Sequence, residues 1–182
     1  MNTNDEFTLT KEEVISLRAG FKYCPRCRAE MVDKDVYGQV RRVCPDCRFV
    51  QFLDPKVGAA VMAVQNGKVV LIKRSMDPAR GSWCMPGGFM EMYETPQETA
   101  IRECKEECGL DVEITALIDV YYYESYRGSG VLIIYKGNVT GGTLQAGDDA
   151  DDAGLFGPDE LPENIVFDSN VQTLAAWRAG DL

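Results

Sequence analysis

The chain has 182 residues, of which 45% are hydrophobic and 26% are charged, a composition that fits a globular protein of one domain plus a small module. Its formal net charge of −10 argues against a nucleic-acid backbone as the main partner, because such binding depends on clustered Lys and Arg. The sequence contains no histidine, which excludes Ser-His-Asp and Cys-His mechanisms.

Two further absences bear on location. No apolar run has the length of a membrane span, and the first residues lack the pattern of a signal peptide. The seven cysteines are therefore expected in a reducing compartment, for which the cytoplasm is the simplest choice, and no membrane partner is expected.

Residues 1–20 are predicted to form an N-terminal helical segment. Thr10 and Glu13 resemble a capping box, and Gly20 would end a short helix. This helix would either pack against the segment that follows or contact a second subunit, and we favour packing.

Residues 21–53 contain two Cys-x-x-Cys pairs separated by 16 residues. This spacing predicts a zinc ribbon in which four thiolates surround one Zn²⁺ ion. The predicted ligands are Cys24, Cys27, Cys44 and Cys47. Because four sulfur ligands leave no open position, the zinc would be structural. A pair of disulfides is the alternative, which a reducing compartment disfavours.

The ribbon also carries five arginines, at positions 26, 28, 41, 42 and 48. Acidic residues lie between them and no series of aromatic residues accompanies them, so we do not expect nucleic-acid binding. Packing onto the main domain or onto a second subunit is favoured, and a homodimer is the expected assembly.

Residues 54–182 are predicted to form the main domain, which begins at Asp54-Pro55. Two β-rich runs, 57–64 and 68–74, flank Asn66-Gly67, a strong hairpin signal. A loop at 78–81 and a short strand at 82–85 follow, with Trp83 expected in the core.

A helix is predicted from residue 96 to residue 108. Thr95, Pro96 and Glu98 suit the N-cap, N1 and N3 positions, and Gly109 suits a left-handed residue that ends the helix. The apolar stripe expected to face the core consists of Ala100, Ile101, Cys104 and Cys108.

The other face of this helix carries Glu103, Glu106 and Glu107, which are neighbours at helical spacing. Such carboxylates suit Mg²⁺ or Mn²⁺, although a solvated acidic face is the alternative. Arg102 follows Glu98 by one turn and could brace the helix or the neighbouring carboxylates. The preceding Pro86-Gly87-Gly88 would allow close backbone approach to a ligand.

The rest of the chain is predicted to add strands at 112–124 and 130–139 and a turn at Gly141-Gly142. The acidic run 147–154 is expected to be a solvated loop, with a strand at 155–156 after it. A last helix would be capped by Asp168 or Ser169 and would pack through Val171, Leu174, Ala175 and Trp177.

The stretch from Gly88 to Leu110 resembles the Nudix box, G-x5-E-x7-R-E-U-x-E-E-x-G-U, in which U is an apolar residue. Every specified position is filled, namely by Gly88, Glu94, Arg102, Glu103, Glu106, Glu107, Gly109 and Leu110. Cys104 at the first U is a mild departure from the usual aliphatic residue, and a buried thiol behaves as a small hydrophobe.

The resemblance implies a Nudix α/β/α sandwich with a mixed sheet, here preceded by the zinc ribbon. It also implies a hydrolase that cleaves a diphosphate in a nucleotide substrate with Mg²⁺ or Mn²⁺. Glu103, Glu106, Glu107 and Gly88 would hold the metal, while Glu94 and Arg102 would support them. Glu103 or a carboxylate of the acidic loop would be the general base. The expected substrate contacts are Gly87, Gly88, Arg74, Asp149 and Asp152.

A zinc ribbon ahead of a Nudix domain is similar to NADH pyrophosphatases and to a group associated with ADP-ribose and FAD. The first group carries SQPWPFPxS after the box, whereas this chain reads YYYESYRGSGVLIIY there. ADP-ribose or a dinucleotide such as FAD is therefore favoured over NADH and nucleoside triphosphates. The non-enzymatic alternatives are a nucleotide sensor and a ribbon-led nucleic-acid-binding protein.

Overall fold

The computed structural model describes residues 20–125, 128–147 and 149–182. They fall into two compact units, one including residues 20–56 and the other including Val57–Tyr123 and Gly130–Leu182. The predicted helix near Thr10 lies outside the described residues.

The first unit is built on a small antiparallel sheet in the order β1-β2-β3, formed by β1 (Val32–Val36), β2 (Gln39–Val43) and β3 (Val50–Gln51). Its core cluster has three buried members, Cys24, Met31 and Cys44, with Ala29 and Phe49 packed against them. A core of this size is too small to stabilise a segment by itself, so the unit needs another source of stability.

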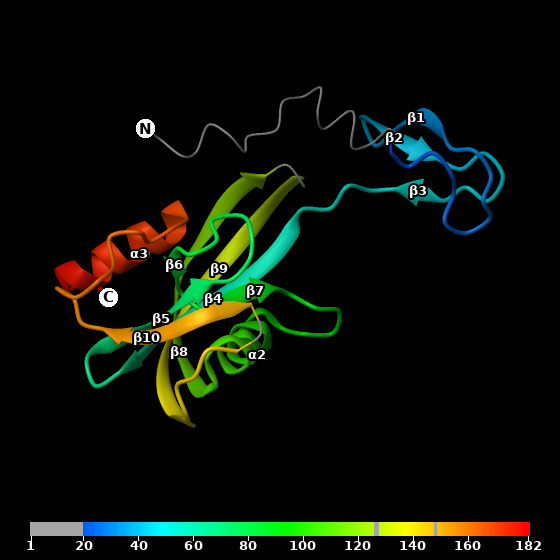
Figure 1. Cartoon of the computed structure of the whole chain (residues 1–182). Coiled ribbons are helices and arrows are strands. Elements are labelled where there is room, and N and C mark those ends of the chain that lie inside the picture. The colour runs from blue at the N-terminus through cyan, green and yellow to red at the C-terminus, as the bar shows by residue number, and fades with distance from the viewer. Residues whose placement is uncertain (1–19, 126–127, 148) are drawn as a thin grey trace. The chain divides into compact units, whose positions relative to one another are not determined.

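The second unit is built on a mixed sheet of seven strands (Figure 1). Five strands follow the order β10-β5-β4-β9-β8, while the short β6 pairs with β5 and the short β7 with β4. The bounds are β4 Lys56–Gln65, β5 Lys68–Arg74, β6 Trp83–Cys84, β7 Gly87–Phe89, β8 Leu110–Ser125, β9 Gly128–Gly142 and β10 Ala150–Phe156.

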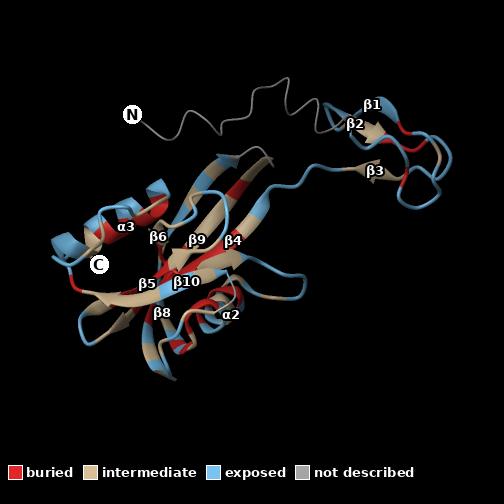
Figure 2. Cartoon of the chain, in the orientation of Figure 1, coloured by how far each residue is buried: buried red, intermediate tan, exposed pale blue. Residues whose placement is uncertain are grey.

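Two helices, α2 (Pro96–Cys108) and α3 (Asp168–Ala179), cover the two faces of this sheet. Alternate side chains of β4 point to opposite faces, so Val61 packs in one cluster with Cys104 of α2 and Met62 in another with Leu174 of α3. The central strands are consequently buried on both sides, as the red segments of Figure 2 show. The predicted α/β/α sandwich with a mixed sheet is confirmed.

The first hairpin agrees with its prediction. Asn66 and Gly67 connect β4 to β5 with φ values of 53° and 76°, and Val64 pairs with Val69. Positive φ at both turn residues is the geometry that Asn-Gly favours. Trp83 is half-buried and its ring meets that of Phe156 edge-on, with 4.9 Å between centroids.

The acidic run differs from its prediction. Strand β10 begins at Ala150, inside the expected loop, and pairs with β5 through Ala150–Arg74 and Asp152–Lys73. A register shift separates these two pairs. The strand forms because its backbone continues the sheet and because Asp152 lies opposite a lysine, so the local charge does not prevent pairing. Strand β9 likewise continues through Gly141-Gly142, where a turn was predicted.

The last helix also corrects its prediction. The N-cap residue is Phe167, which makes no side-chain cap hydrogen bond, and Val171 is 48% exposed. Ala175 is exposed as well. The residues that α3 buries are Ser169, Asn170, Thr173 and Leu174. This partly polar face is accommodated because Asn170 Oδ1 accepts from the Met85 amide at 2.7 Å and Thr173 bonds the Tyr121 hydroxyl. Neither α2 nor α3, the helices of the described residues, is long and apolar enough to cross a membrane.

Candidate active site

Helix α2 is the candidate catalytic helix. Each of its ends is fixed by capping residues that lie next to it in the chain. The Glu98 amide donates to Thr95 Oγ1 at 3.3 Å, and the Thr95 amide donates to Glu98 Oε2 at 2.8 Å, which completes a capping box. Gly109 ends the helix with φ 73° and donates its amide to the Lys105 carbonyl. The predicted bounds, 96 to 108, are confirmed.

The buried stripe of α2 is not the one predicted. Ala100, Cys104 and Cys108 are buried as expected, but Ile101 is 37% exposed and Glu107 is buried in its place. From Ala100 onwards, the buried residues of the helix follow one another at spacings of three or four residues. Ile101 lies at the edge of this stripe. One of the three box carboxylates therefore belongs to the inner face of the helix.

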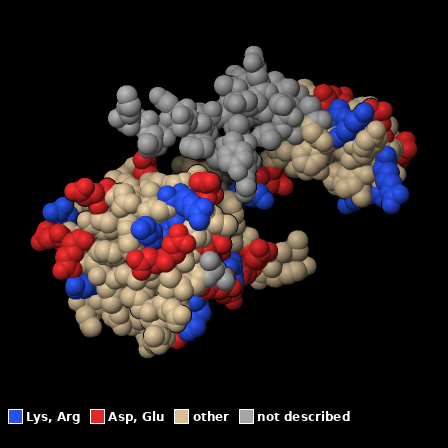
Figure 3. Space-filling view, in the orientation of Figure 1, with Lys and Arg blue, Asp and Glu red and all other residues tan. Residues whose placement is uncertain are grey.

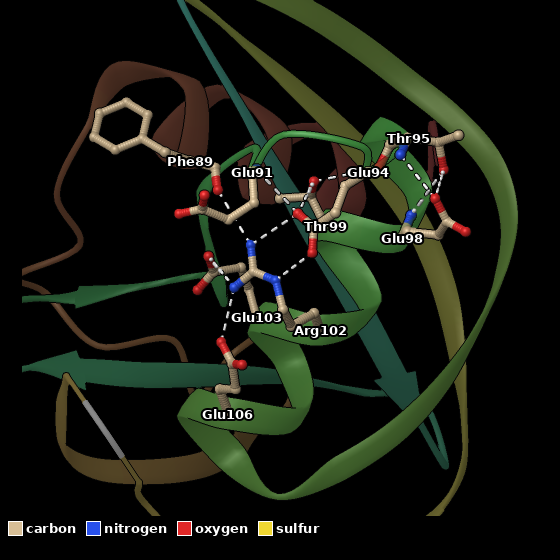
Figure 4. A network of polar contacts seen from close by, with 9 residues as sticks. All are labelled: Phe89, Glu91, Glu94, Thr95, Glu98, Thr99, Arg102, Glu103 and Glu106. Carbon is tan, nitrogen blue, oxygen red and sulfur yellow. Dashed lines mark hydrogen bonds and ion pairs between the residues drawn. The ribbon is translucent and has the colours of Figure 1, made fainter.

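Arg102 is the centre of a polar network that gathers the other carboxylates (Figure 4). Its Nε and Nη2 donate to the two oxygens of Glu94 at 2.6 and 3.1 Å. Its Nη1 donates to Glu103 and to Glu106, both at 2.8 Å, and Nη2 also donates to the Phe89 carbonyl at 3.2 Å. One guanidinium thus ties strand β7 and the following loop to the helix.

Of the two roles expected for Arg102, the structure has the second: it braces the neighbouring carboxylates and binds Glu94, whereas Glu98 is engaged in the capping box. Glu94 also accepts from the Glu91 amide and the Thr99 hydroxyl, each at 3.0 Å. Arg102 and these donors lower the pKa of Glu94 to about 2. Thr99 was not predicted from the sequence. Its position, four residues after the N-cap Thr95, is the signal that could have indicated a contact with the residues at the start of the helix.

Glu107 occupies a different environment from the network. It is 6% exposed, and its Oε2 accepts from the Gly87 amide at 2.9 Å. Burial raises the pKa of Glu107 to about 8, although the Gly87 amide and the charge of Arg74 oppose this. Burial likewise raises the pKa of Glu103. In both carboxylates, the nearby hydrogen bonds and positive charges therefore do not fully offset the cost of burying the negative charge.

The glycines of β7 are required by close approach. A Cβ atom at Gly87 would lie 2.5 Å from Ala60 Cβ and 2.7 Å from the Ala59 carbonyl oxygen. A Cβ atom at Gly88 would overlap the Glu103 carboxylate, whose farther oxygen would be 2.8 Å away. A side chain at Gly87 would push β7 away from β4, whereas one at Gly88 would displace the Glu103 side chain.

The three box glutamates and Asp149 line a pocket of about 440 Å³. Asp149 reaches it because its carbonyl accepts from the Ser75 amide at 2.8 Å, just beyond β5. Gly147, which the sequence reasoning did not single out, binds the Glu107 carbonyl through its amide at 3.1 Å and so places the acidic segment against α2. Asp152 is an exposed residue of β10 and does not line the pocket.

Arg74 ends β5 next to this pocket. Its Nε donates to the Pro78 carbonyl at 2.9 Å, and its guanidinium lies 5.2 Å from the centroid of the Phe167 ring. Its positive charge acts on Glu107 and opposes the rise in the pKa of that carboxyl.

The donor chemistry of the pocket fits a hard divalent cation, because four acidic residues line it while Glu103 and Glu107 are incompletely compensated. The carboxylate oxygens are not drawn tightly together, since Arg102 holds two of them. Among the described residues, only the cysteine quartet brings its ligand atoms within 4.8 Å of one another.

That quartet consists of Cys24, Cys27, Cys44 and Cys47 of the first unit, as predicted from the spacing. The Sγ atoms of Cys24 and Cys47 are 3.5 Å apart and those of Cys27 and Cys44 are 3.3 Å apart. All seven cysteines are free thiols. The quartet is compatible with a zinc ribbon.

Both cysteine turns have the same backbone form. The amides of Arg28 and Arg48 donate to the carbonyls of Cys24 and Cys44, and both arginines have positive φ, 65° and 62°. The sequence repeat Cys-x-x-Cys is therefore a structural repeat, in which each turn presents two sulfur atoms to one point.

The comparisons with known proteins agree with this fold and site. The NUDIX domain model matches residues 54–176. An ADP-ribose pyrophosphatase of Methanocaldococcus jannaschii is 36% identical over 133 residues, which cover 71% of this chain and 78% of that protein. The crystal structure of a NUDIX hydrolase from Nitrosomonas europaea superimposes with a TM-score of 0.80 at 31% identity, covering 87% of this chain and 90% of that one.

A NAD-capped RNA hydrolase NudC of Vibrio atlanticus is 27% identical over 147 residues, which are 78% of this chain and 51% of that protein. The fold, the box and these matches define the class: the chain belongs to the NUDIX family. It is a Nudix hydrolase, an enzyme of the pyrophosphatase and hydrolase type.

Proposed function

We propose that this enzyme hydrolyses the diphosphate linkage of a nucleoside diphosphate derivative, with ADP-ribose or a dinucleotide such as FAD as the substrate. The observation that carries the proposal is the pocket of four carboxylates beside the glycines of β7. The similarity to a protein named ADP-ribose pyrophosphatase supports the choice of substrate.

The catalytic metal in this proposal is Mg²⁺ or Mn²⁺, held by Glu103, Glu106, Glu107 and the backbone of Gly88. When bound, such an ion neutralises charge on phosphoryl oxygens and lowers the pKa of a coordinated water. The hard oxygen donors of the pocket support this choice of metal over a soft one.

The protein residues have separate tasks. Glu94 and Arg102 hold the loop after β7 on α2 and keep Glu103 and Glu106 beside the pocket. Gly87 and Gly88 bring backbone close enough for a diphosphate to lie along β7. Arg74 supplies positive charge to the substrate. The general base is Glu103 or Asp149, which both line the pocket, whereas the place of Asp152 on β10 gives it no support as a substrate contact.

NADH and nucleoside triphosphates are the alternative substrates. No feature of the pocket favours either of them over ADP-ribose or FAD. Nucleic acid is not proposed as a partner. Figure 3 shows basic and acidic side chains interspersed on the visible surface, where a nucleic-acid interface would gather basic ones.

We further propose that Cys24, Cys27, Cys44 and Cys47 bind a structural Zn²⁺ ion, because their geometry suits it and the unit has a small core. We retain the division of the chain into an N-terminal segment 1–20, a ribbon 21–53 and a Nudix domain 54–182. A homodimer in the cytoplasm remains our prediction, and the mass of the purified protein in solution would test the dimer.

The decisive experiment is turnover of ADP-ribose, FAD, NADH and nucleoside triphosphates with Mg²⁺ or Mn²⁺ by the parent protein and by Glu106→Gln. We expect the parent to prefer ADP-ribose or FAD and the variant to lose about 100-fold in kcat. Glu163→Gln, at an exposed position, is the control. Equal turnover by Glu106→Gln and the parent would remove the catalytic assignment, and a preference for a triphosphate would remove the substrate assignment.

A further inference from the structure

Phe167 has a backbone conformation that is unusual for an aromatic residue. Its φ of 68° and ψ of 126° place a bulky residue in the left-handed half of backbone space, which residues with a Cβ atom rarely adopt. The residue is nonetheless 41% exposed. A glycine or asparagine would adopt this φ at lower cost, so the aromatic ring itself requires a reason.

The surrounding backbone fixes this conformation. The Phe167 carbonyl accepts from the amides of Asn170 and Val171 at 2.9 and 3.1 Å, while the preceding Val166 donates to the Trp83 carbonyl at 2.9 Å. Val166 packs against the cluster on the α2 face of the sheet, and Ile165 packs against the cluster on the α3 face. The segment thus runs beside β6 with alternate side chains on opposite faces, as in a strand, and Phe167 follows a residue on the α2 side.

Arg74 connects Phe167 to the carboxylate pocket. Its guanidinium lies over the ring at 5.2 Å from the centroid, a distance at which a cation and an aromatic ring attract each other. Arg74 pairs with Ala150 in the sheet, and the adjacent Ser75 amide binds the carbonyl of Asp149, which lines the pocket. The ring is thus held at the end of β5 beside the proposed reaction site.

We propose that Phe167 is a binding subsite for the planar heterocyclic base of the substrate, with Arg74 holding the ring in position for stacking. A base offers a π-face that stacks on an exposed aromatic ring, and contacts of this kind need no particular pattern of hydrogen bonds. This inference rests on the proposed hydrolysis of a nucleoside diphosphate derivative, and it assigns the base to α3 and the diphosphate to β7 and α2.

The test compares Phe167→Ala and Phe167→Leu on two substrates, ADP-ribose and the diphosphate that joins two ribose 5-phosphates and carries no base. Both variants should raise the KM for ADP-ribose about tenfold with kcat nearly unchanged, because stacking on one base contributes on this scale. The KM for the diphosphate without a base should stay within about twofold of the parent. Phe167→Leu keeps an apolar side chain, and its melting temperature shows whether folding is affected.

Tyr37→Ala is the matched control, because Tyr37 is also an exposed aromatic residue with positive φ, 86% and 55°, but belongs to the first unit. It should leave both KM values unchanged. An equal rise in KM for both substrates, or no rise for ADP-ribose, would overturn the subsite.

A binding measurement separates this inference from the reaction itself. AMP, which contains the base, should change the fluorescence of Phe167→Trp beyond any change in the parent, whereas ribose 5-phosphate should not. This binding result does not require hydrolysis. If the parent hydrolyses none of the diphosphates but AMP changes the fluorescence of Phe167→Trp, the proposed function fails and the subsite stands. An AMP response equal to that of the parent would count against the subsite.

Discussion

Gly88 lies against the carboxylate of Glu103 so closely that no side chain fits between them. The atoms that a new Cβ would meet are the end of a flexible side chain, so Gly88→Ala should displace Glu103 while leaving the fold intact. We expect a loss of about 100-fold in kcat/KM with a loss of about 1 kcal/mol in the free energy of unfolding. Steady-state kinetics and urea denaturation measure the two quantities.

The neighbouring glycine provides the contrast. Gly87→Ala would bring its Cβ to 2.5 Å from Ala60 Cβ and 2.7 Å from backbone atoms of β4, which cannot rotate away. This variant should lose at least about 3 kcal/mol of stability. If Gly88→Ala unfolds as readily as Gly87→Ala, or keeps full activity, the close approach of Gly88 to Glu103 does not have the role assigned here.

The Arg102 network should contribute to both structure and activity. Arg102→Gln leaves Glu94, Glu103 and Glu106 without their shared counter-charge, and it should lower the free energy of unfolding by about 2 kcal/mol. Activity should fall because the loop after β7 loses its hold on α2. The double variant with Glu94→Gln should lose less than the sum of the single variants, since the two residues share one interaction. Additive losses would show that they act independently.

The acid stability of the protein should depend on Glu94. Its pKa falls from 4.5 to about 2 on folding, so its ionised form stabilises the fold above pH 4.5. This stabilisation is lost as the pH falls from 4.5 towards 2, because the unfolded chain then binds more protons than the native one. Glu94→Gln should reduce the pH dependence of the free energy of unfolding in this window, and Glu163→Gln should not. Chemical denaturation at a series of pH values measures it, and parallel curves for parent and Glu94→Gln would contradict the assignment.

Removal of the proposed zinc should affect the first unit selectively. Parent protein purified under reducing conditions should contain about one zinc per chain, and Cys27→Ser should contain little. Cys84→Ser is the control, because Cys84 is buried in the second unit, where burial raises its pKa to about 12. After treatment with a chelator, limited proteolysis should cut within residues 20–56 and leave the Nudix domain intact. Parent protein without zinc would exclude the Cys₄ site.

Local patterns in the sequence were sufficient for several elements. The capped helix from 96 to 108, the Asn66-Gly67 hairpin and the two Cys-x-x-Cys turns each depend on residues close together in the chain, whose hydrogen-bonding groups and φ preferences act over a few positions. The Nudix box could be recognised from residues 88–110 alone, without information on the strands that pack against them.

Other features depended on pairing across the sheet. Local charge suggested a loop at 147–154, but β5 supplied a partner strand and Lys73 opposite Asp152. Glu98 was locally the best partner for Arg102, but the return of β7 to the helix brought the Phe89 carbonyl and Glu94 within reach. The cap of α3 was misassigned because Phe167 owes its backbone conformation to the hydrogen bonds around it.

The sequence by itself determined the class of chemistry through the full match of Gly88–Leu110 to the Nudix box, and helical spacing makes Glu103, Glu106 and Glu107 neighbours without any tertiary contact. Only the tertiary structure decided how they differ. Glu107 turns inward onto the Gly87 amide, whereas Glu103 and Glu106 share Arg102 with Glu94. Burial and long-range partners control charge, and neither can be read from helical spacing alone.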